Sequence, residues 1–89
     1  MTTASLERIQ KDDLAMSVAG ALRIANETAL AHGTNPAQAL VSITEESAPA
    51  GRLWRIHYGP RDYICRRGGD LTIVVDEITE RAVQVLRGQ

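Results

Sequence analysis

Apolar residues recur every three or four positions in the first third of the chain, a pattern typical of an amphipathic helix. The apolar stripe consists of Leu14, Val18, Ala21, Leu22, Ala25 and Ala29. Carboxylates accept hydrogen bonds from free backbone N–H groups at a helix start, and glycine favours the left-handed conformation that ends a helix. Asp12 and Asp13 therefore predict where the helix begins, and His32 with Gly33 predicts where it ends.

Two features near this helix leave alternatives open. Met16, Ile24 and Leu30 lie beside the apolar stripe, so they either widen the buried face or form a second apolar face that contacts a partner. Residues 1–10 are largely polar and form either a flexible arm or an early helical turn.

Alternating apolar and polar residues predict four strands in the rest of the chain. The strands are expected at residues 39–45, 52–58, 71–75 and 81–87, with turns at residues 47–51 and 76–80. In the third strand, Leu71, Ile73 and Val75 lie on one face, and Val74 adds apolar surface on the other. We expect this strand to lie inside a sheet, because a strand that is apolar on both faces needs cover on both.

The second and last strands each have a face that suits contact with the helix. Trp54, Ile56 and Tyr58 form the larger apolar set of the second strand and should meet the helix. Val83 and Val85 should point inward from the last strand. The sheet is therefore expected to bury one face against the helix.

The opposite face of the sheet is less apolar and has no helix to cover it. Leu53, Val74 and Leu86 would lie there among polar residues, so this face is either solvated or covered by another chain. In the first strand, Val41 and Ile43 share one face.

Consecutive strands with short links pair antiparallel, which sets the expected architecture. We predict an α+β fold in which one N-terminal helix packs on a four-stranded antiparallel meander sheet, in the order α-β-β-β-β. A chain of 89 residues has the size of one domain, so we expect residues 1–89 to form a single unit.

Composition narrows the classes of function. The net charge is −1, which does not favour a protein whose whole surface binds polyanions. One Trp, two Tyr and no Phe are too few for a base-stacking platform. We therefore expect no nucleic-acid partner.

The expected location is the cytoplasm. The first residues lack the basic start and apolar centre of a secretory signal, and no apolar run is long enough to span a membrane. Cys65 is the only cysteine, so an intramolecular disulfide is impossible, which fits a reducing compartment.

Residues 59–69, between the second and third strands, concentrate arginine and tyrosine. These residue types dominate protein contacts because a guanidinium or a rigid ring gives much contact for little lost freedom. The candidate partner-binding residues are Arg61, Asp62, Tyr63, Arg66 and Arg67. The structural alternative is that the arginines are only solvent-exposed residues of a loop and that Tyr63 anchors the loop to the sheet.

The sequence shows no catalytic set, metal site or cofactor motif. His32 and His57 are not at metal-ligand spacing from each other or from Cys65. Gly68 and Gly69 open a strand and lack the lysine of a phosphate-binding loop. The enzymatic alternative is a redox role for the Cys65 thiol, whose pKa neighbouring arginines would lower if the side chain is exposed.

The order of elements resembles two families. An alanine-rich helix, a strand with Trp54 between Leu53 and Arg55, and the run at residues 71–83 resemble the PepSY domain of some protease propeptides. In that family a glycine stands where this chain has Glu80, so the turn must differ or Glu80 must adopt a positive φ at a cost of about 1 kcal/mol.

The second resemblance is to small bacterial immunity proteins of the nuclear-transport-factor-like class, which also end in a Gly-Gly strand, a hairpin and a short tail. Both resemblances imply a protein without catalytic residues that binds another protein. We therefore expect a small bacterial, non-enzymatic protein-binding module, with contact through residues 59–69. A structural homodimer is the alternative.

Overall fold

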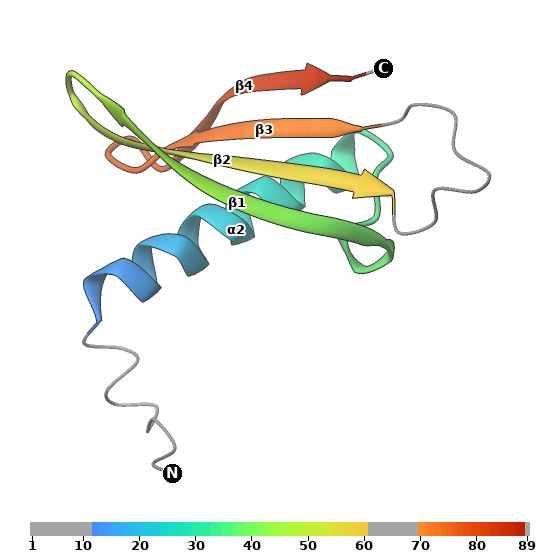
Figure 1. Ribbon diagram of the computed structural model, residues 1–89, viewed down its shortest axis with the longest axis horizontal. Helices are drawn as coiled ribbons and strands as arrows, with labels where there is room; N and C mark the ends of the chain where they lie inside the picture. Colours follow the sequence, from blue (N-terminus) through green and yellow to red (C-terminus); the bar gives the residue numbers. More distant parts are fainter. Residues whose placement is uncertain (1–11, 61–69, 89) are drawn as a thin grey trace, which may run out of the picture.

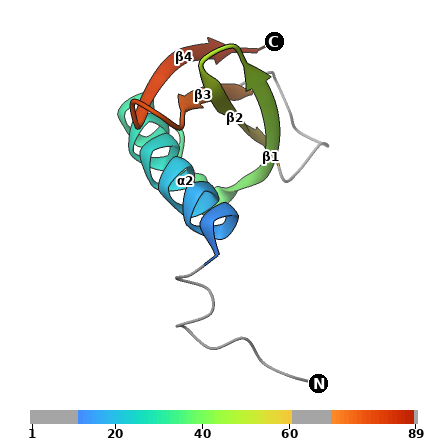
Figure 2. The same cartoon turned by 90° about the vertical axis from the view of Figure 1, so that its left-hand side faces the viewer.

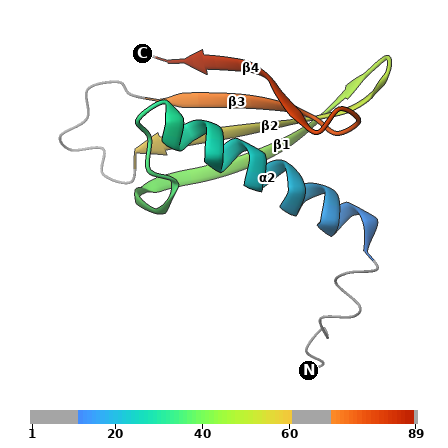
Figure 3. The same ribbon diagram turned by 180° about the vertical axis from the view of Figure 1, so that it is seen from behind.

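The computed structural model describes residues 12–60 and 70–88. Its elements are helix α2 (Asp13–Ala31), the short 3-10 helix η1 (Pro36–Gln38), and strands β1 (Ala39–Ala48), β2 (Gly51–Pro60), β3 (Leu71–Asp76) and β4 (Arg81–Arg87). The strands form one sheet in the order β1-β2-β3-β4, with every neighbouring pair antiparallel. Helix α2 crosses one face of this sheet (Figures 1 and 3). The predicted α+β fold, one helix on a four-stranded antiparallel meander, is confirmed.

Both ends of α2 lie where their capping residues predict. The Asp12 carboxylate accepts a hydrogen bond from the Ala15 N–H at 3.1 Å, which caps the start. At the other end His32 is the C-cap, and its Nδ1 donates to the Thr28 carbonyl at 2.9 Å. Gly33 follows with φ of 83°, in the left-handed region that glycine adopts without strain.

The face that α2 buries is centred on a row of alanines. Ala21, Ala25 and Ala29 are buried, whereas Leu14 is 52% exposed, so the expectation that Leu14 belongs to the buried stripe is wrong. The reason is steric: large side chains rise from the sheet, and small alanine side chains let the helix approach them closely. The sheet is curved, with α2 on one side of it (Figure 2).

The centre of the sheet supplies the rest of the core. Trp54, Ile56 and Tyr58 of β2 are at most 4% exposed, which confirms that this set faces the helix. Strand β3 lies between β2 and β4, as its two apolar faces predict. Val74, on the face away from α2, is 2% exposed between its cross-strand neighbours Arg55 and Gln84.

Strand β4 contains an irregularity that the alternation did not predict. Val74 pairs with Gln84, but Val75 pairs with Ala82, so Val83 is an extra residue in β4. Such a bulge turns the extra side chain away from its expected position. Val83 is 54% exposed, and Ala82 packs against the core in its place. The prediction that Val83 points inward is therefore wrong.

The two tight turns also refine the predicted boundaries. Strands β1 and β2 extend into the turn predicted at residues 47–51, and leave only Pro49 and Ala50 between them. In the β3–β4 turn the Asp76 carboxylate accepts a hydrogen bond from the Ile78 N–H at 2.8 Å. Glu80 has φ of 56°, so of the two alternatives, a different turn or a positive φ at Glu80, the structure has the positive φ.

Candidate protein-binding surface

Strand β1 forms one edge of the sheet. Within residues 12–60 and 70–88 it pairs only with β2, from Ala39 opposite Pro60 to Ala48 opposite Gly51, in an unbroken register. The backbone N–H and C=O groups on its outer side therefore have no strand partner in the described sheet. Such an edge can pair with an added strand.

Helix α2 leaves the helix-facing side of β1 open. The helix packs chiefly on β3, with smaller contacts to β2 and β4. Val41 lies opposite Tyr58 and Ile43 opposite Ile56, two buried residues, so both β1 side chains are on the helix-facing side. They are nevertheless 38% and 37% exposed. The apolar face of the sheet thus extends one strand further than the helix that should cover it.

An apolar depression lies between α2 and β1, and we refer to it as the α2–β1 channel. It is open to solvent and has a volume of about 440 Å³. Its lining includes Leu22, Asn26, Leu30, Pro36, Ala37 and Val41. Leu14 and Val18 continue the same side of the helix at four-residue steps, because residues four apart share a helix face. Leu30 is 60% exposed, so this wall is open to solvent.

The acidic residues of β1 are already paired. Arg52 Nε lies 2.9 Å from a Glu45 oxygen. Arg55 donates from Nε and Nη2 to the two carboxylate oxygens of Glu46, at 3.0 and 3.3 Å. Both arginines belong to β2, so the charges of β1 are balanced within the sheet. A segment that pairs with β1 therefore needs no basic residues.

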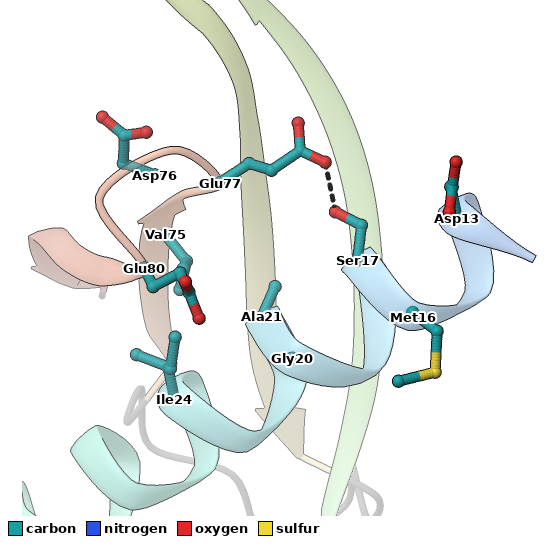
Figure 4. A pocket seen from close by; sticks show the side chains of 10 residues that line it. All are labelled: Asp13, Met16, Ser17, Gly20, Ala21, Ile24, Val75, Asp76, Glu77 and Glu80. Atoms are coloured by element: carbon teal, nitrogen blue, oxygen red, sulfur yellow. Dashed lines mark hydrogen bonds between the residues drawn. The ribbon is translucent and has the colours of Figure 1, made fainter. Parts of the chain in front are cut away.

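A second depression, of about 240 Å³, lies between the start of α2 and the β3–β4 turn (Figure 4). Trp54 Nε1 donates to Ser17 Oγ at 2.8 Å, and Ser17 Oγ donates to Glu77 Oε1 at 2.6 Å. Arg52 lies over the Trp54 ring, 5.4 Å from its centroid, and 3.6 Å from a Glu77 oxygen. These contacts join helix, strand and turn, so we assign this group a structural role.

The face of the sheet away from α2 holds a histidine and a carboxylate in contact. His57 Nε2 lies 3.0 Å from Asp70 Oδ2, and this contact orients the ring. Ser42 is opposite His57 across the β1–β2 pair, but no hydrogen bond joins them. The described residues contain no group of three or more potential metal ligands. This pair alone makes no nucleophile–base arrangement.

The partner-binding residues predicted from the sequence lie outside the described residues. They are Arg61, Asp62, Tyr63, Arg66 and Arg67, and Cys65 lies outside as well. Their role stays a prediction. Of the three residues beside the helix stripe, Ile24 packs against the core, whereas Met16 and Leu30 are exposed. The α2–β1 channel was missed, because its two walls come from separate elements whose distance the sequence pattern does not specify.

No protein-family model, curated protein or solved structure matches this chain. The resemblances to PepSY domains and to the nuclear-transport-factor-like immunity proteins therefore stay predictions. Among the described residues, no helix has the length and apolar character needed to cross a membrane.

Proposed function

We propose that this protein is a non-enzymatic binding module that receives an extended segment of another polypeptide along β1. The observation that carries the proposal is the exposed apolar face of an edge strand: Val41 and Ile43 lie on the helix-facing side of the sheet, yet α2 does not cover them. Both resemblances found in the sequence are to families that bind other proteins, which motivates the same proposal.

The binding mode that this geometry favours is strand addition. An added strand would form main-chain hydrogen bonds with the outer edge of β1, and every second side chain would face the α2–β1 channel. Because the channel wall is mainly apolar and Glu45 and Glu46 are paired with Arg52 and Arg55, a segment with alternating aliphatic residues fits best. Main-chain bonds would supply affinity, and the channel would supply selectivity.

A library of displayed peptides, selected against the whole protein, tests this proposal. We expect enrichment of peptides with aliphatic residues at alternate positions, and we expect Ile43→Lys to abolish their binding. Val83→Lys is the matched control, because it places the same charge on the opposite edge strand at a residue that is also exposed. The proposal is wrong if no peptide is enriched at a concentration where the protein is monomeric, or if the enriched peptides bind the Ile43→Lys variant unchanged.

Residues 59–69 remain a proposed second contact. Alanine at Arg61, Tyr63, Arg66 and Arg67 should then weaken the binding of a selected polypeptide partner that also depends on Ile43. Unchanged binding by the fourfold variant would remove this segment from the proposed surface and leave the β1 contact standing.

A further inference from the structure

The two edges of the sheet differ in how they resist pairing. Strand β4 carries a bulge at Val83 and has arginine at both ends, Arg81 and Arg87. Bulges and charges on an edge hinder strand addition. Strand β1 is ten residues long, pairs with β2 without a bulge, and contains no proline. Its two charged residues, Glu45 and Glu46, are paired with Arg52 and Arg55 of β2. Of the two edges, β1 is the one open to pairing.

We propose that the segment that pairs with β1 is the β1 strand of a second copy of this chain, in an antiparallel dimer with a twofold axis at Ser42. This inference rests on the proposed function, because it names the polypeptide that the same surface receives. The two sheets would join into one continuous eight-stranded sheet, with both α2 helices on the same face.

The position of the axis follows from the residues on the helix-facing side. Antiparallel pairing about Ser42 places Val41 opposite Ile43 of the second copy, and Ile43 opposite its Val41. Side chains directly opposite each other in neighbouring strands pack together, so the four would form one aliphatic cluster. An axis at Ile43 would instead set Val41 against Glu45, which pairs an aliphatic side chain with a carboxylate.

The charges of β1 permit this self-association. Glu45 and Glu46 both lie in the second half of the strand, so antiparallel pairing carries the carboxylates of the two copies to opposite ends. Glu45 would face Ala39, and no carboxylate would face another. Glu45 remains paired with Arg52, and Glu46 with Arg55, in each copy. Repulsion between the carboxylates of the two copies is therefore small.

The placement of α2 also permits it. Because the helix lies over β2, β3 and β4, it leaves room above two adjoining β1 strands. Leu22 and Leu30 from each copy would border that space, where they and Val41 now line an open channel. The dimer would thus cover the apolar surface that one chain leaves exposed.

Sedimentation of the full chain over a range of micromolar concentrations tests the assembly. We expect a reversible dimer. Ile43→Lys should raise its dissociation constant at least about tenfold, because both copies carry the substitution and two cross-strand pairs are disrupted. Val83→Lys should dimerise like the parent chain. Circular dichroism of both variants checks that they fold. A chain that stays monomeric throughout, or equal dimerisation of the two variants, would overturn the inference.

Disulfide cross-linking tests the register independently. In a Cys65→Ser background, Ser42→Cys places two thiols opposite each other at the axis, close enough for a disulfide. Thr44→Cys is the matched control, because its thiols would lie four residues apart along the strands, about 13 Å. We expect mild oxidation to cross-link the first variant only. Equal cross-linking of both, or none in the first, contradicts the register.

The oligomeric state and the peptide selection together distinguish a wrong dimer from a wrong binding surface. A monomeric chain whose displayed peptides still require Ile43 would retain strand addition at β1 and exclude the second copy as its occupant. A chain that neither dimerises nor enriches peptides at β1 would exclude both.

Discussion

Ser17 is the residue that connects three elements at the start of α2. Its hydroxyl accepts from Trp54 Nε1 and donates to Glu77, so one side chain joins the helix to β2 and to the β3–β4 turn. The Trp54 side chain is almost fully buried, which makes an unpaired indole N–H costly. The three residues are up to 60 positions apart in sequence.

We predict that Ser17→Ala lowers the free energy of unfolding by about 1–2 kcal/mol, because the buried indole loses its acceptor. Urea unfolding measures the loss. Ser47→Ala is the control, since Ser47 is exposed near the end of β1, away from the proposed axis at Ser42, and should change stability little. Equal losses in the two variants would show that the Ser17 hydrogen bonds do not stabilise the fold.

Tyr58 makes stability depend on pH in alkaline solution. Burial raises the pKa of Tyr58 to about 12, and its hydroxyl donates to Asn26 Oδ1 at 2.7 Å. The folded state therefore disfavours the phenolate, whose pKa in the unfolded chain is near 10.

The stabilisation by neutral Tyr58 should be complete below pH 10 and decline as the pH rises towards 12, by about 2–3 kcal/mol in all. The free energy of unfolding, measured against pH for the parent and for Tyr58→Phe, checks this. Between pH 10 and pH 12, the free energy of unfolding of the parent should fall relative to that of Tyr58→Phe. A constant difference would contradict the raised pKa.

Glu80 shows a local strain that glycine would relieve. A residue with a side chain costs about 1 kcal/mol or more in the left-handed region, where Glu80 has φ of 56°. We predict that Glu80→Gly raises the free energy of unfolding by about 0.5–1 kcal/mol, measured by urea unfolding. Thr79→Gly, in the same turn but without positive φ, should not stabilise.

At the scale of elements, the alanine row of α2 determines how near the helix lies to the sheet. Ala25 and Ala29 are fully buried against large side chains from β2 and β3. Short side chains on the helix and long ones on the sheet fill the layer between them. The same arrangement leaves the larger Leu14 and Leu30 exposed at the margin of the helix.

Ala25→Leu should therefore overpack this layer and lower the free energy of unfolding by about 1–3 kcal/mol. Thermal unfolding measures the effect. Ala19→Leu provides the control, because Ala19 is exposed on the same helix and accepts a larger side chain. If both variants unfold at the temperature of the parent, the helix does not approach the sheet as closely as described.

At the scale of the whole molecule, one helix covers three of four strands. Within the described residues, the fourth strand, β1, keeps an exposed apolar face and an edge without a strand partner, whereas β4 has a bulge and terminal arginines. This asymmetry is the basis of the association that we propose at β1.

Hydrogen exchange should reveal the asymmetry directly. The β1 amides that point away from β2 should exchange quickly in dilute protein and become protected as the concentration rises, because a second β1 strand would bond to them. The outward-facing β4 amides should exchange at the same rate throughout. Protection of β1 that does not change with concentration would contradict a reversible contact there.

Local signals account for what could be predicted about individual elements. The caps of α2 act within four residues, so Asp12 and His32 mark its ends correctly. The strict alternation of β2 identifies Trp54, Ile56 and Tyr58 as its buried side. Each of these depends on interactions between near neighbours.

The candidate site could be predicted only in part. The sequence directs attention to the arginines and Tyr63 of residues 59–69, which lie outside the described residues. It also contains Leu30, Val41 and Ile43, but no pattern indicates that these three would remain exposed together. Their exposure depends on which strands the helix covers.

The sequence by itself determined the helix, the strands, their order and most of their faces, because helix caps and side-chain alternation act within short stretches of chain and consecutive strands tend to pair. Only the tertiary structure decided that Val83 bulges outward, that alanines rather than Leu14 meet the sheet, and that α2 does not cover β1. Those outcomes depend on how side chains far apart in sequence fill one layer. Side chains from several segments pack together in that layer, so no single segment specifies the packing.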